Sequence, residues 1–277
     1  MPLINNKYDV EVNTMNTTQS KFTTKDLVTI GLFAALSFIA LYFKIDIPSP
    51  VGKPFLHMGN MFTILAALLF GGIIGGASGS IGMGLWDIIN GYGAYAYKTF
   101  ILKFGIGLFV GLVASKGKKK DAKSPLPIIA IAAATFIALG IFLAFLAHTA
   151  GYEIHFTSLN IENKNTLTIT PALYIFCLIL GTLLAISCFA IKKISIKMQY
   201  AILGSVAGIV FNIIGEFAFG AITLIIAGSK VGPALFASLI SLPSTVINGT
   251  FSIIFALILY VPISKALLKS GYIKAYH

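Results

Sequence analysis

Ionisable side chains are rare within the apolar stretches of this sequence, and three of them stand out. Asp87 and Lys103 lie in apolar segments of the first half, and Glu216 lies midway along a later one. Inserting a charged side chain at membrane depth costs roughly 2.5–3.5 kcal/mol, so such residues usually face a partner or a cavity. The three charges therefore predict a polar cavity inside an otherwise apolar protein.

Amide, imidazole and aromatic side chains accompany these charges. Asn212 precedes Glu216 by four residues, which places the two on one face of a helix. Aromatic rings offer flat faces for stacking a ligand, and a few polar groups orient it. We therefore predict a site for a small heteroaromatic compound with polar substituents. Its candidate residues are His57, Asn60, Trp86, Asp87, Asn90, Tyr92, Tyr95, Lys103, Asn212, Glu216 and Asn248.

Several of these residues also have a purely structural interpretation. Lys103 and Glu216 would satisfy one another as an ion pair between two helices. Asp87 would cap a helix end, His57 would be a helix-end residue, and Asn248 would hydrogen-bond a neighbouring helix. The tyrosines would form an aromatic belt at the membrane interface. The clustering of all these side chains favours a ligand site more than any single residue does.

The composition is that of a membrane protein. Of the 277 residues, 57% are hydrophobic and only 10% are charged, whereas soluble domains carry about 25% charged residues. We predict an all-α fold, a polytopic membrane helical bundle with about eight transmembrane helices. They are expected at about residues 25–43, 57–70, 72–89, 99–114, 128–147, 171–191, 198–227 and 233–268.

These helices divide the chain into successive predicted parts. A polar, disordered cytoplasmic N-terminus without a signal peptide precedes four helices, and an inserted helical hairpin separates these from the last two. The loop at 44–56, which carries three prolines, is either a lid over the site or a linker. The predicted parts are 1–24, the four helices at 25–123, the hairpin at 124–197 with an external loop at 148–170, the two helices at 198–268, and a cytoplasmic tail at 269–277.

The lysines predict an orientation. The net charge of +11 does not indicate nucleic acid, because the lysines fall in the connections between apolar segments. With both termini inside, eleven lysines lie on the cytoplasmic side and five outside, as the positive-inside rule requires. The eleven are at positions 116, 118, 119, 120, 123, 192, 193, 197, 265, 269 and 274, and the five are at 44, 53, 98, 164 and 230.

Glycine is concentrated between Gly71 and Gly84, where the spacings 71/75, 72/76 and 75/79 repeat the pattern G-x-x-x-G. This pattern is typical of helices that pack closely in lipid. The nucleotide-binding pattern G-x-x-x-x-G-K-[ST] is absent from the sequence. Gly31 and Ala35, four residues apart in the first helix, predict a similar close approach of another helix.

Enzymatic motifs are also absent from the sequence. It contains no H-E-x-x-H, no G-x-S-x-G and no paired histidines at metal-binding spacing. Cys177 and Cys188 are interpreted as small buried hydrophobic residues. We therefore predict no catalytic residue, no metal and no cofactor.

One family shares these features. The run IPSPVGKPFLHMGNMFTILAALLFGG, the segment LWDIINGY and the segment FILKFG resemble the substrate-binding S components of energy-coupling factor (ECF) transporters, in the branch for riboflavin, hydroxymethylpyrimidine and vitamin B6-like compounds. The resemblance covers roughly 31–115 and 200–268. Two departures are that the family usually has six helices, and that Asn60 replaces a common aspartate. The matching residues are His57, Gly59, Asn60, Asp87, Gly91, Tyr92, Phe100, Lys103, Gly105, Glu216, Pro243 and Asn248.

The resemblance implies a function and partners. It implies a multi-pass protein of the bacterial plasma membrane that is not an enzyme. The protein would capture a vitamin or vitamin precursor at the outer face and dock on a transmembrane scaffold with two ATPase subunits. Small-residue faces at Gly31, Ala35, Gly75 and Gly79 would form the docking surface. The alternatives are a stand-alone secondary transporter, with Lys103 and Glu216 as coupling groups, and an intramembrane enzyme on lipid-linked substrates.

Overall fold

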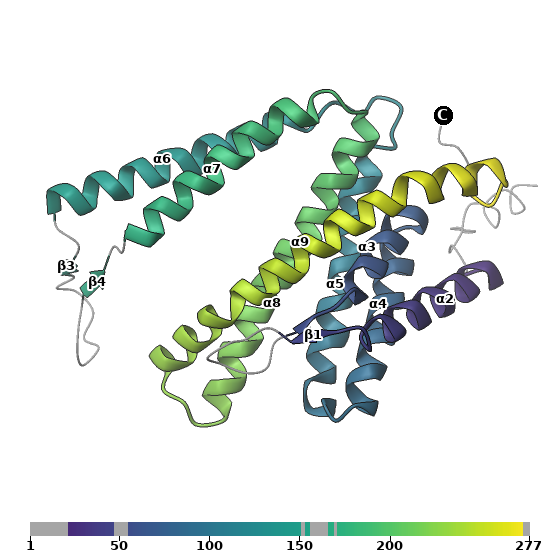
Figure 1. Cartoon of the computed structure of the whole chain (residues 1–277), viewed down its shortest axis with the longest axis horizontal. Coiled ribbons are helices and arrows are strands. Elements are labelled where there is room, and N and C mark those ends of the chain that lie inside the picture. The colour runs from purple at the N-terminus through teal and green to yellow at the C-terminus, as the bar shows by residue number, and fades with distance from the viewer. Residues whose placement is uncertain (1–21, 47–54, 151–152, 156–165, 169–170, 274–277) are drawn as a thin grey trace, which may run out of the picture.

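The computed structural model describes residues 22–46, 55–150, 153–155, 166–168 and 171–273 (Figure 1). These residues form eight helices and two short antiparallel hairpins, which confirms the all-α fold class. The helices are α2 (Thr24–Ala40), α3 (Gly59–Phe70), α4 (Gly72–Ile89), α5 (Gly93–Lys116), α6 (Leu126–Ala150), α7 (Pro171–Ile191), α8 (Ile196–Ile226) and α9 (Val231–Lys269). Strand β1 (Ile45–Asp46) pairs with β2 (Phe55–Leu56), and β3 (Glu153–His155) pairs with β4 (Thr166–Thr168).

The chain is a multi-pass membrane protein. Among the described helices, α4, α5, α6, α8 and α9 are long and apolar enough to cross a membrane, and α3 is a shorter apolar helix.

A capping box between Thr23 and Asp26 starts α2. Gly71, at φ +106°, allows the turn between α3 and α4. The first 21 residues and the proline-containing segment 47–54 lie outside the described residues. The disorder predicted for the N-terminus stays a prediction, and whether the loop is a lid or a linker stays open.

The largest difference from the predicted bounds is at the start of α5. The sequence predicts a helix from Thr99, whereas α5 begins at Gly93. The additional turn and a half, residues 93–98, ends at Lys98. Lys98 was not among the candidate residues, and it is now part of the helix.

Helix α4 lies at the centre of the first four helices, and its glycines contact helices on three sides. A Cβ atom at Gly76 would lie 2.6 Å from the Phe104 carbonyl oxygen of α5, and one at Gly82 would lie 2.3 Å from the Ala34 carbonyl oxygen of α2. Backbones this close require residues without side chains. The predicted packing role of the G-x-x-x-G repeats is therefore confirmed.

The same contacts correct half of the predicted docking surface. A Cβ at Gly75 would lie 2.4 Å from the Ala67 nitrogen, and one at Gly79 would lie 2.2 Å from the Thr63 hydroxyl oxygen, both on α3. Gly75 and Gly79 are buried inside this chain, because α3 already occupies the face that they form. Nothing described lies within 4 Å of a Cβ at Gly31, so the α2 face stays available to a partner.

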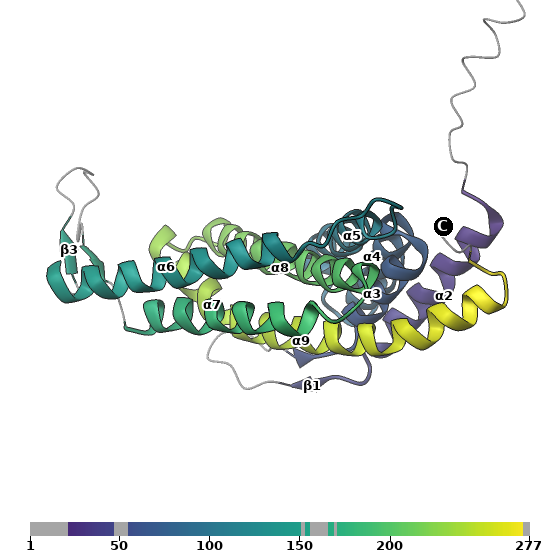
Figure 2. The same ribbon diagram turned by 90° about the horizontal axis from the view of Figure 1, so that it is seen from above.

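Helices α6 and α7 form a hairpin that extends away from the other helices (Figures 1 and 2). They pack mainly on each other, with Gly140 against Leu178 and Gly181 against Ile137. The hairpin agrees with the helices predicted near 128–147 and 171–191. That it is an insertion, and that the loop at 148–170 is external, stay predictions, and most of that loop lies outside the described residues.

We expect the end of the bundle that carries Lys119 to be cytoplasmic and the α8–α9 connection with Lys230 to be external. Cys177 and Cys188 are first replaced by alanine, and a single cysteine is then introduced. Both lysines are exposed, so Lys230→Cys should react with a membrane-impermeant maleimide in intact cells. Lys119→Cys should react only after lysis. Labelling of Lys119→Cys in intact cells would contradict the orientation with both termini inside.

Candidate functional site

A cavity of about 540 Å³ lies among α4, α5, α8 and α9, beside the start of α3. Its size is within the usual 300–1,000 Å³ of small-molecule sites. Nine of the eleven candidate residues line it, from five separate segments of the chain. They are His57, Asn60, Asp87, Tyr92, Tyr95, Lys103, Asn212, Glu216 and Asn248.

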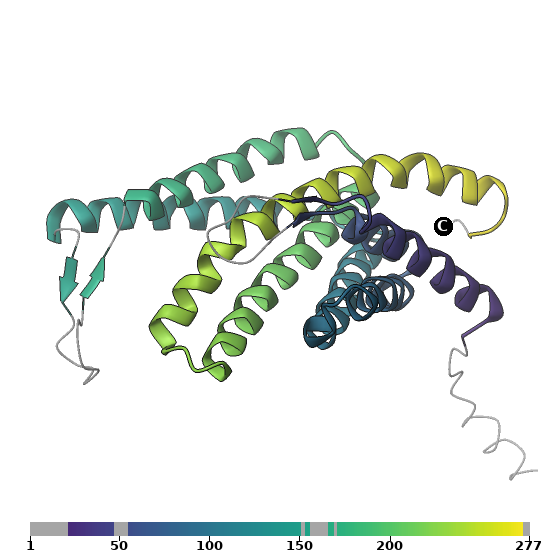
Figure 3. The same cartoon turned by 60° about the horizontal axis from the view of Figure 1, so that its bottom comes forward.

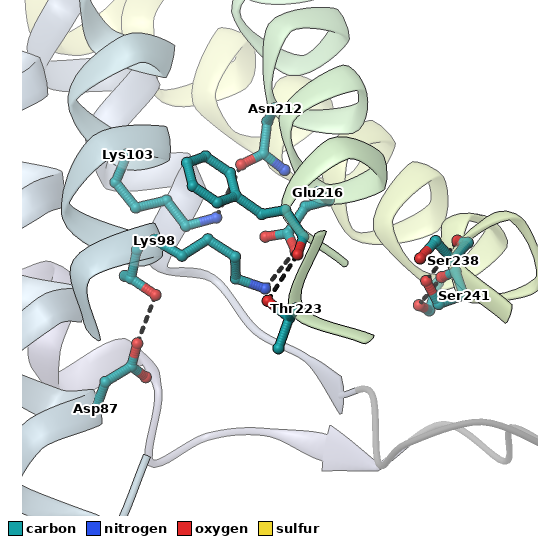
Figure 4. Close-up of polar contacts among 11 residues, drawn as sticks. Asp87, Lys98, Lys103, Asn212, Glu216, Thr223, Ser238 and Ser241 are labelled. Atoms are coloured by element: carbon teal, nitrogen blue, oxygen red, sulfur yellow. Dashed lines mark hydrogen bonds and ion pairs between the residues drawn. The ribbon is translucent and has the colours of Figure 1, made fainter. Parts of the chain in front are cut away.

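Helices α4 and α5 hold one wall through polar contacts. The Thr99 hydroxyl donates a hydrogen bond to the Asp87 carboxylate (Figure 4). Lys103 is 7% exposed, and its ammonium donates a hydrogen bond to the Asn212 side-chain oxygen of α8 at 3.0 Å. A buried ammonium held by an amide keeps hydrogens available for a ligand, since it has three donors.

The ion pair of the cavity joins Lys98 of α5 to Glu216 of α8, with 2.7 Å between nitrogen and oxygen (Figure 4). This corrects the interpretation in which Lys103 and Glu216 form the pair. The reason is geometric, because Lys103 lies one turn deeper on α5 and reaches Asn212 instead. Both paired side chains are about one-fifth to one-quarter exposed, so a ligand can reach them.

The start of α3 and the middle of α9 meet at the opposite wall. The Asn248 side-chain oxygen accepts a hydrogen bond from the His57 backbone nitrogen at 3.5 Å, and the Gly59 nitrogen donates to His57 Nδ1 at 3.2 Å. Asn60 is 3% exposed, and its side-chain oxygen has no hydrogen-bond partner among the described residues. An unsatisfied buried acceptor costs roughly 1–3 kcal/mol, which a ligand donor would recover.

Two candidate residues, Trp86 and Asn90, are not among the residues that line the cavity. Trp86 is 3% exposed and stacks on Tyr92, with ring centroids 5.5 Å apart. The Asn90 side chain donates to the Trp86 carbonyl oxygen at 2.9 Å. The structure therefore corrects their assignment as direct contacts. Trp86 supports Tyr92, and Tyr92 and Tyr95 present the aromatic surface of the site.

Several lining residues were missed by the sequence prediction. On α9, Ser241, Ser244 and Thr245 line the cavity together with Asn248. The spacing of i, i+3, i+4 and i+7 is that of one helical face, and this polar stripe in an apolar helix was the available signal. The sequence indicated less clearly that Lys98 lines the cavity. It lies just before the helix expected from Thr99, so it was counted with the lysines of the connections.

The sequence of this chain was compared with protein families, with curated proteins and with solved structures. The family model described as "ECF-type riboflavin transporter, S component" matches residues 21–185, more than half of the chain. This match runs through α6 and most of α7 and ends before α8. No solved structure matches the chain.

Two curated relatives match shorter stretches. A UPF0397 protein of Streptococcus pneumoniae is 39% identical over 93 residues, which are 33% of this chain and 49% of the relative. An uncharacterised protein of Pyrococcus woesei is 37% identical over 67 residues, which are 24% of this chain and 45% of the relative. The chain therefore spans about half the length of these curated relatives.

Proposed function

This chain belongs to the family of ECF-type riboflavin transporter S components, and from this premise we propose that it is the substrate-capture subunit of an ECF importer. Its ligand is a small heteroaromatic vitamin or vitamin precursor. The ligand binds from the outer face in the cavity among α4, α5, α8 and α9. A transmembrane scaffold with two ATPase subunits then drives its delivery inward.

The observation that carries this proposal is the composition of the cavity wall. Tyr92 and Tyr95 offer aromatic faces, while Lys103 supplies donors and the Asn60 oxygen is an unused acceptor. A ring with both donor and acceptor substituents fits such a surface better than a simple cation or a sugar does. Lys98 and Glu216, already paired, add one positive and one negative group at the mouth.

We expect the purified chain to bind at least one of four compounds in isothermal titration. Hydroxymethylpyrimidine, pyridoxine and thiamine test a small ring, and riboflavin tests the compound in the family's description. Asn60→Leu should weaken binding by about tenfold, because it removes a buried acceptor without opening a cavity. Asn90→Leu is the matched control, since Asn90 does not line the cavity. Failure of all four compounds to bind would contradict the proposed ligand class.

We expect the exposed face of α2 to dock on the scaffold. Gly31 and Ala35 are both exposed and lie on one face, and small residues allow another helix to approach closely. Ala35→Trp should abolish copurification of the scaffold and leave ligand affinity unchanged. The control is Ala134→Trp, the same substitution at an exposed alanine of α6. Equal recovery of the scaffold with Ala35→Trp and with wild type would contradict this docking face.

A further inference from the structure

A second cavity, of about 290 Å³, lies at the other end of the bundle. Its walls come from the start of α2, the end of α3, the start of α8, the end of α9 and the connection after α5. Figure 3 shows the N-terminal end of α2 and the C-terminal end of α9 on the same side of the molecule. None of the candidate site residues lines this cavity.

Three lysines converge on it from separate segments. Lys25 comes from α2, Lys118 from the connection after α5, and Lys197 from the first turn of α8. The lining carboxylate, Asp26, accepts hydrogen bonds from the nitrogen and hydroxyl of Thr23. The lining side chains therefore carry two more positive than negative charges.

Two of the three lysines contact the surrounding backbone or an aromatic ring. The Lys118 ammonium donates to the Leu68 carbonyl oxygen at 3.2 Å, and the Lys25 ammonium lies 3.7 Å from the centre of the Tyr272 ring. Burial lowers the pKa of Lys118, and the charge of Lys197 lowers it further. Like charges in a partly buried site favour an anion between them.

Tyr260 supplies an independent sign of a ligand. Its side chain lines the cavity and is 5% exposed, yet its hydroxyl makes no hydrogen bond to any described residue. The hydroxyl is not one of the fully buried atoms without a partner, so a ligand in the cavity can reach it. An anion with several acceptor oxygens would bind this hydroxyl and the ammonium groups together.

The remaining lining is apolar and indicates the source of the anion. Leu69, Phe70, Ile74 and Leu268 form a wall beside the lysines. We propose that this cavity binds a phosphate group, carried by an anionic phospholipid of the surrounding membrane. Basic pockets between transmembrane helices bind such head groups on the cytoplasmic side, where the leaflet is anionic. This agrees with the orientation predicted from the lysines.

The test is native mass spectrometry of the full chain, delipidated in detergent and mixed with lipids of identical acyl chains. Wild type should retain phosphatidylglycerol in preference to phosphatidylcholine. The double variant Lys118→Gln, Lys197→Gln should retain about tenfold less phosphatidylglycerol. Lys120→Gln is the control, since it removes an exposed charge of the same basic run without touching the cavity.

Tyr260→Phe keeps the shape of the cavity and should also lower retention, which tests the proposal if the lysine variants fold poorly. Millimolar inorganic phosphate should leave the bound lipid in place. If inorganic phosphate displaces the lipid, the cavity is a phosphate site, and its ligand is the free anion. Equal retention by wild type and all variants would overturn the proposal. Loss of scaffold copurification in the lysine variants with unchanged lipid retention would overturn it as well, and would assign the cavity to the protein partner.

Discussion

Gly107→Ala is expected to destabilise the folded bundle strongly, because the added methyl group would meet backbone atoms of α4. A Cβ at this position would lie 2.1 Å from the Gly76 nitrogen and 2.4 Å from its Cα. Both contacts are backbone atoms of α4, which no side-chain rotation relieves. Helices α4 and α5 would have to separate along their whole glycine seam, which also includes Gly72 and Gly111.

Overpacking of this kind costs roughly 1–3 kcal/mol and occasionally more. The measurement is the unfolding midpoint of the purified protein in mild detergent, followed by tryptophan fluorescence. The chain has one tryptophan, Trp86, which lies near the far end of α4 and reports on this packing. Gly31→Ala is the matched control, because a Cβ there has no described neighbour within 4 Å.

Gly31→Ala should leave the midpoint unchanged or raise it, since alanine stabilises a helix interior relative to glycine by roughly 0.5–1 kcal/mol. An equal shift for Gly107→Ala and Gly31→Ala would contradict the close approach of α4 and α5. In that case the change in helix propensity from glycine to alanine would by itself explain both shifts of the unfolding midpoint.

Glu216→Gln is expected to weaken ligand binding by about tenfold or more. The substitution keeps the shape of the side chain and leaves the Lys98 ammonium without its carboxylate, now 2.7 Å away. Removing a partner from a charged hydrogen bond costs roughly 1.5–3 kcal/mol. A ligand group that donates to Glu216 would lose the same charged acceptor.

The measurement is isothermal titration with the compound that the wild-type chain binds. Asp121→Asn is the control, because it neutralises an exposed carboxylate in the connection after α5, away from the cavity. The double variant Lys98→Gln, Glu216→Gln should lose less affinity than the two single losses combined, since residues in contact couple. Unchanged affinity in Glu216→Gln would remove this residue from the site.

The apolar composition and the apolar segments of the sequence determined the fold class, because a membrane leaves few alternatives to a helix bundle. The bounds of α4 and α7 agree with the sequence prediction, since glycine or proline begins each one and a polar residue follows each end. The start of α5 was predicted six residues too late. The segment from Gly93 to Lys98 contains two tyrosines and a lysine, and it looks like a loop when hydropathy alone is considered.

The sequence also determined which residue types would meet. Asn212 and Glu216 share a face of α8 because they are four residues apart, and both line the cavity. Their partners came from other helices, and spacing along one chain cannot pair helices. The tertiary structure decided that Glu216 contacts Lys98 and that Asn212 contacts Lys103.

For the glycines, too, the sequence indicated the kind of contact and the tertiary structure decided the partner. The repeat from Gly71 to Gly84 indicated close packing, but it did not say whether the neighbour belongs to this chain or to a partner. Only the tertiary structure decided that α3 covers Gly75 and Gly79, whereas Gly31 is left open. The physical reason is that a small-residue face is complementary to any helix. Connections and the packing of the whole bundle select the one that reaches it.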